Sequence, residues 1–281
     1  MTEEQISLLC QLAVRAGEEI LKIYAEPFDV ENKADGSPVT KADAAAERII
    51  LAGLGNAFPG IPVIAEESVE AGNLPEVADV YFLVDPLDGT KEFLKKNGEF
   101  TVNIALIEKG VPVFGVVSAP ALGEIYWGGQ SLSSDAAAPC AFKARIEGGL
   151  LADVEAVKVR TPPPGGLSVL ASRSHLSEET SALIDRLNVA ERLSVGSSLK
   201  LCWVAAGKAD LYPRLAPTMQ WDIAAGDAVV RAAGGAVVLA ADGSDFVYSV
   251  PVNATKDDLR NPHFIAVTSR DLLPEPAAAA S

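Results

Sequence analysis

The stretch Val80-Tyr81-Phe82-Leu83-Val84-Asp85-Pro86-Leu87-Asp88-Gly89-Thr90 decides how the rest of the chain is interpreted. Its first five residues are apolar and predict a buried strand. Two carboxylates, a glycine and a hydroxyl follow, and Pro86 excludes a regular helix at that point. Residues 90–94 predict a short helix whose free N–H groups face the same place. Carboxylates suit hard divalent cations and a helix N-terminus suits phosphate, so we expect a metal-dependent phosphoryl-transfer site.

Other acids lie where they could join this site. The apolar segment 61–65 reads as a second strand and ends at Glu66. If the two strands are neighbours in one sheet, Glu66, Asp85 and Asp88 converge, and their mutual repulsion makes a cation the natural partner. Asp43 falls in the first turn of a predicted helix, where it either complements the helix dipole or belongs to the site.

These acids have a mechanistic use in phosphate-ester hydrolysis. Two Mg²⁺ ions about 3.5–4 Å apart can hold both the attacking water and the leaving oxygen. Asp85 is placed to bridge two ions, and Asp88 could serve the second. Thr90 could position or deprotonate the water, with an acid such as Asp43 behind it.

Composition limits the kind of partner and the compartment. The chain has 281 residues, 49% of them hydrophobic, and a formal net charge of −15. This charge argues against a nucleic-acid polymer as partner and leaves a small phosphorylated molecule as the expected substrate. The cysteines Cys10, Cys140 and Cys202 form no CxxC pair, which predicts a reducing cytoplasm. We expect no secretory signal and no transmembrane helix, and we leave peripheral membrane association open.

The remaining pattern predicts an α/β protein. Helices are expected over residues 3–25 and from Asp43 to Pro59, and an antiparallel meander over 100–127. Residues 129–166 become small and polar, with some strand expected around 154–159, and a subdomain boundary is placed near 160–166. The expected division is therefore 1–160, which carries most of the metal ligands, and 161–281. Strands and helices alternate in the second half, as in layered α/β folds.

Two motifs identify a resemblance to a known family. The segment from Asp85 to Thr90 matches the first signature of the inositol-monophosphatase-like superfamily of Mg²⁺-dependent, lithium-sensitive phosphatases, and Trp221-Asp222-Ile223-Ala224-Ala225-Gly226 matches the second. Within that superfamily, residues 85–120 resemble the bacterial CysQ-type 3'(2'),5'-bisphosphate nucleotidases. Further matches are Ser172-Arg173-Ser174-His175, Gly196-Ser197-Ser198-Leu199-Lys200 and Leu211-Tyr212-Pro213-Arg214. The resemblance covers roughly residues 5–268, is weakest over 129–160, and implies a layered αβαβα sandwich of the sugar-phosphatase type.

The resemblance implies a role for each matching residue. Glu66, Asp85 and the Leu87 carbonyl would bind a first Mg²⁺, and Asp85, Asp88 and Asp222 a second. Asp43 and Thr90 would orient the nucleophilic water, and a third, weaker ion would lie beside Asp43 or Glu67. The Gly89 and Thr90 N–H groups would cradle the phosphate, and Li⁺ would inhibit.

The resemblance also suggests a substrate, adenosine 3',5'-bisphosphate, which would be converted to AMP and phosphate in sulfate assimilation or nucleotide recycling. A second phosphate needs cationic partners. The candidates are Lys200, Arg214, Arg173 and Lys91. For each, the alternative is a structural or surface role. The expected assembly is a monomer or a homodimer.

Four rival functions remain open. Inositol monophosphatase and fructose-1,6-bisphosphatase activities belong to the same superfamily. Ser197-Ser198-Leu199-Lys200 also fits the S-x-x-K pattern of penicillin-binding proteins, but the S-D-N and K-T-G tripeptides of that class are absent from the sequence. A non-enzymatic nucleotide sensor is the fourth rival, and the presence of every expected ligand argues against it.

Overall fold

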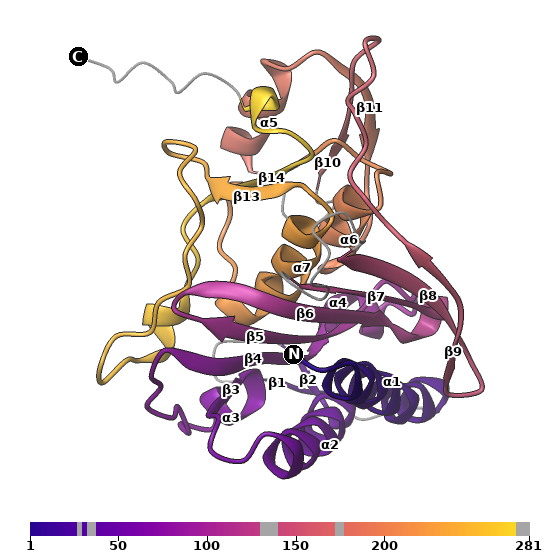
Figure 1. The fold of residues 1–281 in the computed structure, drawn as a ribbon, viewed down its shortest axis with the longest axis vertical. Helices are drawn as coiled ribbons and strands as arrows, with labels where there is room; N and C mark the ends of the chain where they lie inside the picture. Colours follow the sequence, from indigo (N-terminus) through magenta and orange to yellow (C-terminus); the bar gives the residue numbers. More distant parts are fainter. Residues whose placement is uncertain (27–29, 33–37, 130–139, 172–176, 274–281) are drawn as a thin grey trace.

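The computed structural model describes residues 1–26, 30–32, 38–129, 140–171 and 177–273, and two sheets dominate it (Figure 1). The larger sheet has the strand order β3-β4-β5-β6-β7-β8-β9 and the smaller one β11-β10-β12-β14-β13. The strands of the larger sheet are β3 (Val63–Ala65), β4 (Val80–Asp88), β5 (Thr101–Glu108), β6 (Val111–Ala119), β7 (Glu124–Gly129), β8 (Ala141–Glu147) and β9 (Leu150–Ala156). Those of the smaller sheet are β10 (Leu167–Leu170), β11 (Val189–Leu193), β12 (Leu211–Arg214), β13 (Ala236–Leu239) and β14 (Phe264–Val267). A separate short pair joins β1 (Val30–Asn32) to β2 (Pro38–Thr40).

Two helices, α1 (Glu3–Ala25) and α2 (Lys41–Ala57), cover one face of the larger sheet (Figure 1). Thr2 and Gln5 form a capping box at the start of α1. The apolar stripes of both helices pack on side chains such as Phe82 and Ile104. The sequence expectation for this part of the chain is confirmed.

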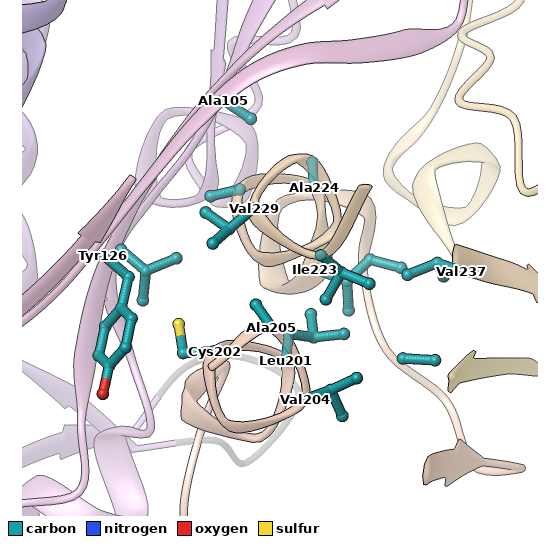
Figure 2. Close-up of a cluster of buried hydrophobic side chains, with 14 of the residues drawn as sticks. Ala105, Tyr126, Leu201, Cys202, Val204, Ala205, Ile223, Ala224, Val229 and Val237 are labelled. Atoms are coloured by element: carbon teal, nitrogen blue, oxygen red, sulfur yellow. The ribbon is translucent and has the colours of Figure 1, made fainter. Parts of the chain in front are cut away.

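The helices α6 (Leu199–Ala205) and α7 (Gln220–Ala232) form a layer between the two sheets. Figure 2 shows Ala224 and Val229 of α7 between Tyr126 of the larger sheet and Val237 of the smaller one. Small residues let α7 approach the larger sheet closely, because Gly115 on β6 lies directly against the backbone of Ala225. Helix α7 is therefore fixed against strands that come from the first half of the chain.

A further helix, α5 (Glu178–Asp185), packs on the outer face of the smaller sheet through Ile184. The layers therefore run α1/α2, larger sheet, α6/α7, smaller sheet, α5, and the expected αβαβα sandwich is confirmed. Short helices complete the described chain: α3 (Glu66–Glu70), α4 (Thr90–Leu94), and the 3₁₀ turns η1 (Pro120–Leu122), η2 (Lys256–Leu259) and η3 (Arg270–Leu272). Among the described helices, none has the length and apolar character needed to cross a bilayer.

Two local expectations differ from the structure. Strand β4 continues through Asp88, where a turn after Val84 was expected. Residues 141–156 form the hairpin β8–β9 at the edge of the larger sheet, where mostly loop was expected; residues 130–139 lie outside the described part. Among the alternating strands expected in the second half, β11 was the hardest to place from sequence, because its main chain pairs with β10 while most of its side chains are exposed. The division into 1–160 and 161–281 stays a prediction.

Gly115→Ala is expected to lower the free energy of unfolding by about 2–3 kcal/mol, because overpacking forces backbone shifts. A Cβ at Gly115 would lie 2.2 Å from the Ala225 carbonyl oxygen and 2.7 Å from its Cα, so α7 must move away from β6. Urea unfolding, analysed with the same m-value for the variant and the unaltered protein, measures this loss of free energy of unfolding.

Gly55→Ala is the matched control, because a Cβ at Gly55 in α2 meets nothing within 4 Å. Alanine is the better helix former, so this variant is expected to be about 0.5–1 kcal/mol more stable. Equal stability of the two variants would contradict the close packing of α7 on β6.

Candidate active site

The parallel pairing of β3 and β4 brings the first acids together. In this pairing Ala65 lies opposite Val84, so the next residues along the two strands, Glu66 and Asp85, are also level with each other. Glu66 begins α3, and Asp85 is 1% exposed. The sequence expectation that these two strand ends are neighbours is thus met by the register.

A β-bulge in β4 places Asp85 and Asp88 on the same side of the sheet. Asp85 lies opposite Asn103 on β5 and Asp88 opposite Thr101, so a three-residue step on β4 faces a two-residue step on β5. Because residues two apart in a strand share a face, both aspartates lie on the side of Asn103 and Thr101. The Leu87 side chain packs in the cluster beneath α1 and α2, and its N–H donates to Asp85 Oδ1 at 3.0 Å.

Gly89 ends the strand and begins α4. Its φ of +95° is a conformation that residues with a Cβ rarely adopt, so the glycine is required here. A Cβ would also come within 3.4 Å of the Glu99 carbonyl oxygen. Thr90 is the first residue of α4, lies two residues after Asp88 in the chain and is half-buried.

Asp222 reaches the site from the N-terminal turn of α7. Its Oδ2 accepts a hydrogen bond from the Met219 N–H at 2.8 Å, which fixes the carboxylate at the helix start. Burial raises the pKa of Asp222 well above its usual range, and the charges of Asp88 and Glu66 raise it further. The sensitivity of this pKa to Asp88 and Glu66 places all three carboxylates in one electrostatic environment.

Asp43 also belongs to this environment. It lies in the first turn of α2 and is fully buried. The pKa of Asp85 is raised well above its usual range, first by burial and then by the negative charges of Glu66, Asp88, Asp222 and Asp43. The four other acids that the sequence singled out as carboxylate ligands or as a water-orienting acid therefore all act on Asp85, and the five together come from four elements of the fold.

The donor set fits a hard divalent cation. Carboxylate oxygens are the ligands that Mg²⁺ takes in proteins, and a cluster of buried acids that raise one another's pKa is stabilised by a bound cation. As the side chains stand, no group of three or more His, Cys, Asp or Glu residues within the described part of the chain already forms a metal-holding arrangement.

Asp88 is held by residues that come from the second half of the chain. Its Oδ2 accepts hydrogen bonds from the Ser197 hydroxyl and, at 2.7 Å, from the Ser198 N–H. Burial raises the pKa of Asp88, whereas the Ser197 hydrogen bond and the positive charge of Lys200 lower it. This contact ties the loop before α6 to the end of β4.

The basic candidates have different positions. Lys200 is almost fully buried, donates to the Ser197 carbonyl oxygen at 2.8 Å and lies 5.5 Å from the centre of the Tyr212 ring. Arg214 lowers the pKa of Asp222 by its charge, and its buried Nε has no hydrogen-bond partner within the described residues. Lys91 is exposed on α4, and Arg173 lies outside the described residues.

Sequence reasoning gave no role to several supporting residues. Glu47 of α2 accepts hydrogen bonds from the Glu67 N–H at 2.8 Å and the Ser68 hydroxyl at 2.6 Å, and so fixes α3 and its first residue Glu66. Thr101 and Asn103 contact the serines that hold Asp88. In the sequence, the only sign of a role for Thr101 and Asn103 is that they lie in a stretch that matches the nucleotidases. The sequence gives no sign of a role for Glu47.

Acids lie at the ends of β3 and β4 and at the start of α7, within an αβαβα sandwich. This combination is that of a known class of phosphatases. The model of the inositol monophosphatase family matches residues 1–278, and the chain belongs to that family.

Particular relatives are more specific. A Salmonella typhimurium protein named 3'(2'),5'-bisphosphate nucleotidase CysQ is 47% identical over 231 residues, which cover 82% of this chain and 88% of that protein. The crystal structure of CysQ from Bacteroides thetaiotaomicron superposes with a TM-score of 0.76 at 39% identity and covers 95% of this chain and 98% of that one. The Thermotoga maritima IMPase TM1415 superposes with a TM-score of 0.71 at 25% identity, over 94% and 92% of the two chains.

Proposed function

We propose that this protein is a Mg²⁺-dependent 3'(2'),5'-bisphosphate nucleotidase that removes the 3'-phosphate of adenosine 3',5'-bisphosphate to give AMP and phosphate. The observation that carries the proposal is the 47% identity to a protein named for this activity. The shared environment of the acids at the ends of β3, β4 and α7 supports it, because this reaction needs cations at that point.

The proposed ligand roles follow the two groups of acids. Glu66, Asp85 and the Leu87 carbonyl would hold one Mg²⁺, and Asp85, Asp88 and Asp222 would hold a second. Asp43 or Glu67 would take part in holding a third, weaker ion. When bound, these ions supply charge neutralisation for the phosphate and a lowered pKa for the attacking water. We also propose that Li⁺ inhibits the protein.

The chain's own residues perform the remaining work in this proposal. Thr90 orients the attacking water through its hydroxyl and passes the proton of that water toward Asp43. The N–H groups of Gly89 and Thr90 hold the phosphate oxygens, because Thr90 begins α4. Water attacks in line, the bond from phosphorus to the 3'-oxygen breaks, and no phosphoenzyme forms.

The proposed specificity depends on the second phosphate of the substrate. Arg214 has a buried Nε without a partner in the described chain, which a phosphate oxygen can satisfy. Lys200 adds positive charge, which lowers the pKa of Asp88. We propose a cytoplasmic role in sulfate assimilation or nucleotide recycling, which the free cysteines Cys10, Cys140 and Cys202 support.

A substrate panel tests the proposal. Phosphate release with Mg²⁺ is measured from adenosine 3',5'-bisphosphate, inositol 1-phosphate and fructose 1,6-bisphosphate at equal concentrations. We expect kcat/KM to be highest for the nucleotide by about 100-fold, because inositol 1-phosphate lacks a second phosphate and fructose 1,6-bisphosphate lacks the nucleoside. Either lack leaves polar groups of the site unmatched, and an unmatched polar group costs several kcal/mol. A preference for either of the other two compounds would overturn the proposal, and no turnover of any phosphate ester would favour a sensor.

A further inference from the structure

Five polar groups form a continuous row from Asp88 to Asn103, which we call the hydroxyl chain. The Ser197 hydroxyl contacts the Asp88 carboxylate and lies 2.5 Å from the Thr101 hydroxyl. The Thr101 hydroxyl is also 2.8 Å from that of Ser198, which is 2.7 Å from the Asn103 side-chain amide. The row therefore contains four contacts between five groups.

The far end of the hydroxyl chain is closed to water. Thr101 is fully buried, Asn103 is 1% exposed and Ser198 is 4% exposed. Asn103 lies opposite Asp85 in the β4–β5 pairing, so it shares a sheet face with both aspartates of β4. Each contact in the chain must therefore be made by the side chains themselves, with the hydrogens that they carry.

A count of these hydrogens shows what Asn103 must do. A carboxylate that binds a cation can only accept, and each of the three hydroxyls supplies one hydrogen. Four contacts need four hydrogens, so the fourth must come from the Asn103 amide. In the orientation with Asn103 Oδ1 toward Ser198, one contact lacks a hydrogen and the buried Nδ2 has no partner in the described chain.

Rotating the amide by 180° about its last bond resolves both problems. Oxygen and nitrogen exchange places at nearly the same positions, so Nδ2 donates to Ser198. Ser198 then donates to Thr101, Thr101 to Ser197, and Ser197 to Asp88. The orphan becomes an amide oxygen, which proteins leave unpaired more often than a buried N–H.

We propose that Asn103 is a positioning residue that supplies the fourth hydrogen, so that the whole hydroxyl chain points toward Asp88 and holds its carboxylate in one orientation for a cation. The inference rests on the proposed function for the assignment of Asp88 as a cation ligand. Hydrogen bonds that point the same way polarise one another, so the effect of Asn103 reaches Asp88 through Ser198, Thr101 and Ser197.

The test measures Mg²⁺ binding by calorimetry and phosphate release by kinetics in the full chain. Asn103→Leu keeps the shape of the side chain and removes its donors, and Thr101→Ala interrupts the hydroxyl chain in the middle. Both are expected to weaken Mg²⁺ binding about 10- to 100-fold, the range for residues that orient metal ligands. Thr101→Ser keeps the hydroxyl and is expected to bind Mg²⁺ within about threefold of the unaltered protein.

Ser118→Ala is the control for loss of a buried hydroxyl. Ser118 on β6 is fully buried, has no hydrogen-bond partner among the described residues and lies outside the hydroxyl chain. Its Mg²⁺ affinity is expected to stay within about twofold, because it does not orient a ligand.

The outcomes separate this proposal from the proposed function. If Asn103→Leu lowers the melting temperature but leaves Mg²⁺ affinity unchanged, Asn103 is structural and the inference is wrong. If Asn103→Leu does not fold, equal Mg²⁺ affinity of Thr101→Ala and Thr101→Ser overturns the inference. If the unaltered protein binds Mg²⁺ without hydrolysing any phosphate ester, the proposed function fails, while the affinities of the variants still decide the role of Asn103.

Discussion

Asp222→Asn is expected to reduce kcat/KM by about 10³-fold or more and, at the same time, to make the metal-free protein more stable. The loss of activity follows because the proposed second Mg²⁺ would lose a charged ligand that comes from α7, and charge stabilisation is the largest contribution to such reactions. Phosphate release from adenosine 3',5'-bisphosphate under saturating Mg²⁺ measures this part.

The gain in stability has an electrostatic origin. Burial and the charges of Asp88 and Glu66 raise the pKa of Asp222, which means that its ionised form is unfavourable in the folded protein. An uncharged amide removes that cost, so the melting temperature in a chelator is expected to rise by a few degrees, at roughly 2–4 °C per kcal/mol. Added Mg²⁺ is expected to stabilise the unaltered protein more than the variant.

Asp227→Asn on the same helix is the matched control with the opposite sign. Asp227 is fully buried, and burial raises its pKa to about 6. Unlike Asp222, it pairs with a buried cation, Arg231, at 2.7 Å and accepts a hydrogen bond from Tyr248 at 3.0 Å. Loss of its charge leaves Arg231 without its partner, so we expect lower stability and retained Mg²⁺-dependent activity. If Asp222→Asn lowered the stability of the metal-free protein as Asp227→Asn does, the repulsion between the acids would be refuted.

Arg160→Ala is expected to give the largest loss of stability outside the site, about 3 kcal/mol, because removing one partner of a buried ion pair leaves the other charge uncompensated. Arg160 donates to both oxygens of Asp210, at 2.8 and 2.7 Å, and to the Ser168 hydroxyl at 2.9 Å. Asp210 is fully buried, whereas the Arg160 side chain is 34% exposed, so we place the loss at the lower end of the usual range.

Arg192→Ala provides the comparison with an exposed pair. Arg192 contacts Asp185 at 2.6 Å, but the two side chains are 49% and 62% exposed. Such pairs contribute about 0–1 kcal/mol, so this variant is expected to unfold almost as the unaltered protein does. Both variants are assayed for Mg²⁺-dependent phosphate release, which Arg160→Ala is expected to retain; similar losses of stability would contradict the role assigned to burial.

The acids of the candidate site could be predicted from the sequence, whereas the residues that hold them in place could not. Asp85 and Asp88 stand out because an apolar run precedes them, and Asp222 stands out because it lies in a recognised motif. The register that makes Glu66 level with Asp85 is a property of long-range pairing, which local patterns do not specify. The expectation that the acids share one environment agrees with their mutual effects on pKa, while their roles as ligands remain predictions.

The hairpin β8–β9 was predicted only in part, as some strand around 154–159, for a related reason. Strand β9 exposes most of its side chains at the edge of the larger sheet, with Leu150 and Val154 in contact with solvent. An edge strand buries little, so its sequence shows no regular alternation of apolar and polar residues. The hydroxyl chain also leaves no pattern in the sequence. Thr101 and Ser198 are brought together only by the packing of α6 and β5.

The position of α7 between the two sheets has a consequence for synthesis of the protein. The face of the larger sheet that carries Tyr81, Leu83 and Ile107 is covered by side chains of α6 and α7, which are translated about a hundred residues later. During synthesis the chain therefore exposes an apolar surface before α6 and α7, which bury it, have been translated. Chaperones bind such exposed apolar surfaces. The same long-range closure makes folding slow for a protein of this size and leads us to expect that both sheets melt together.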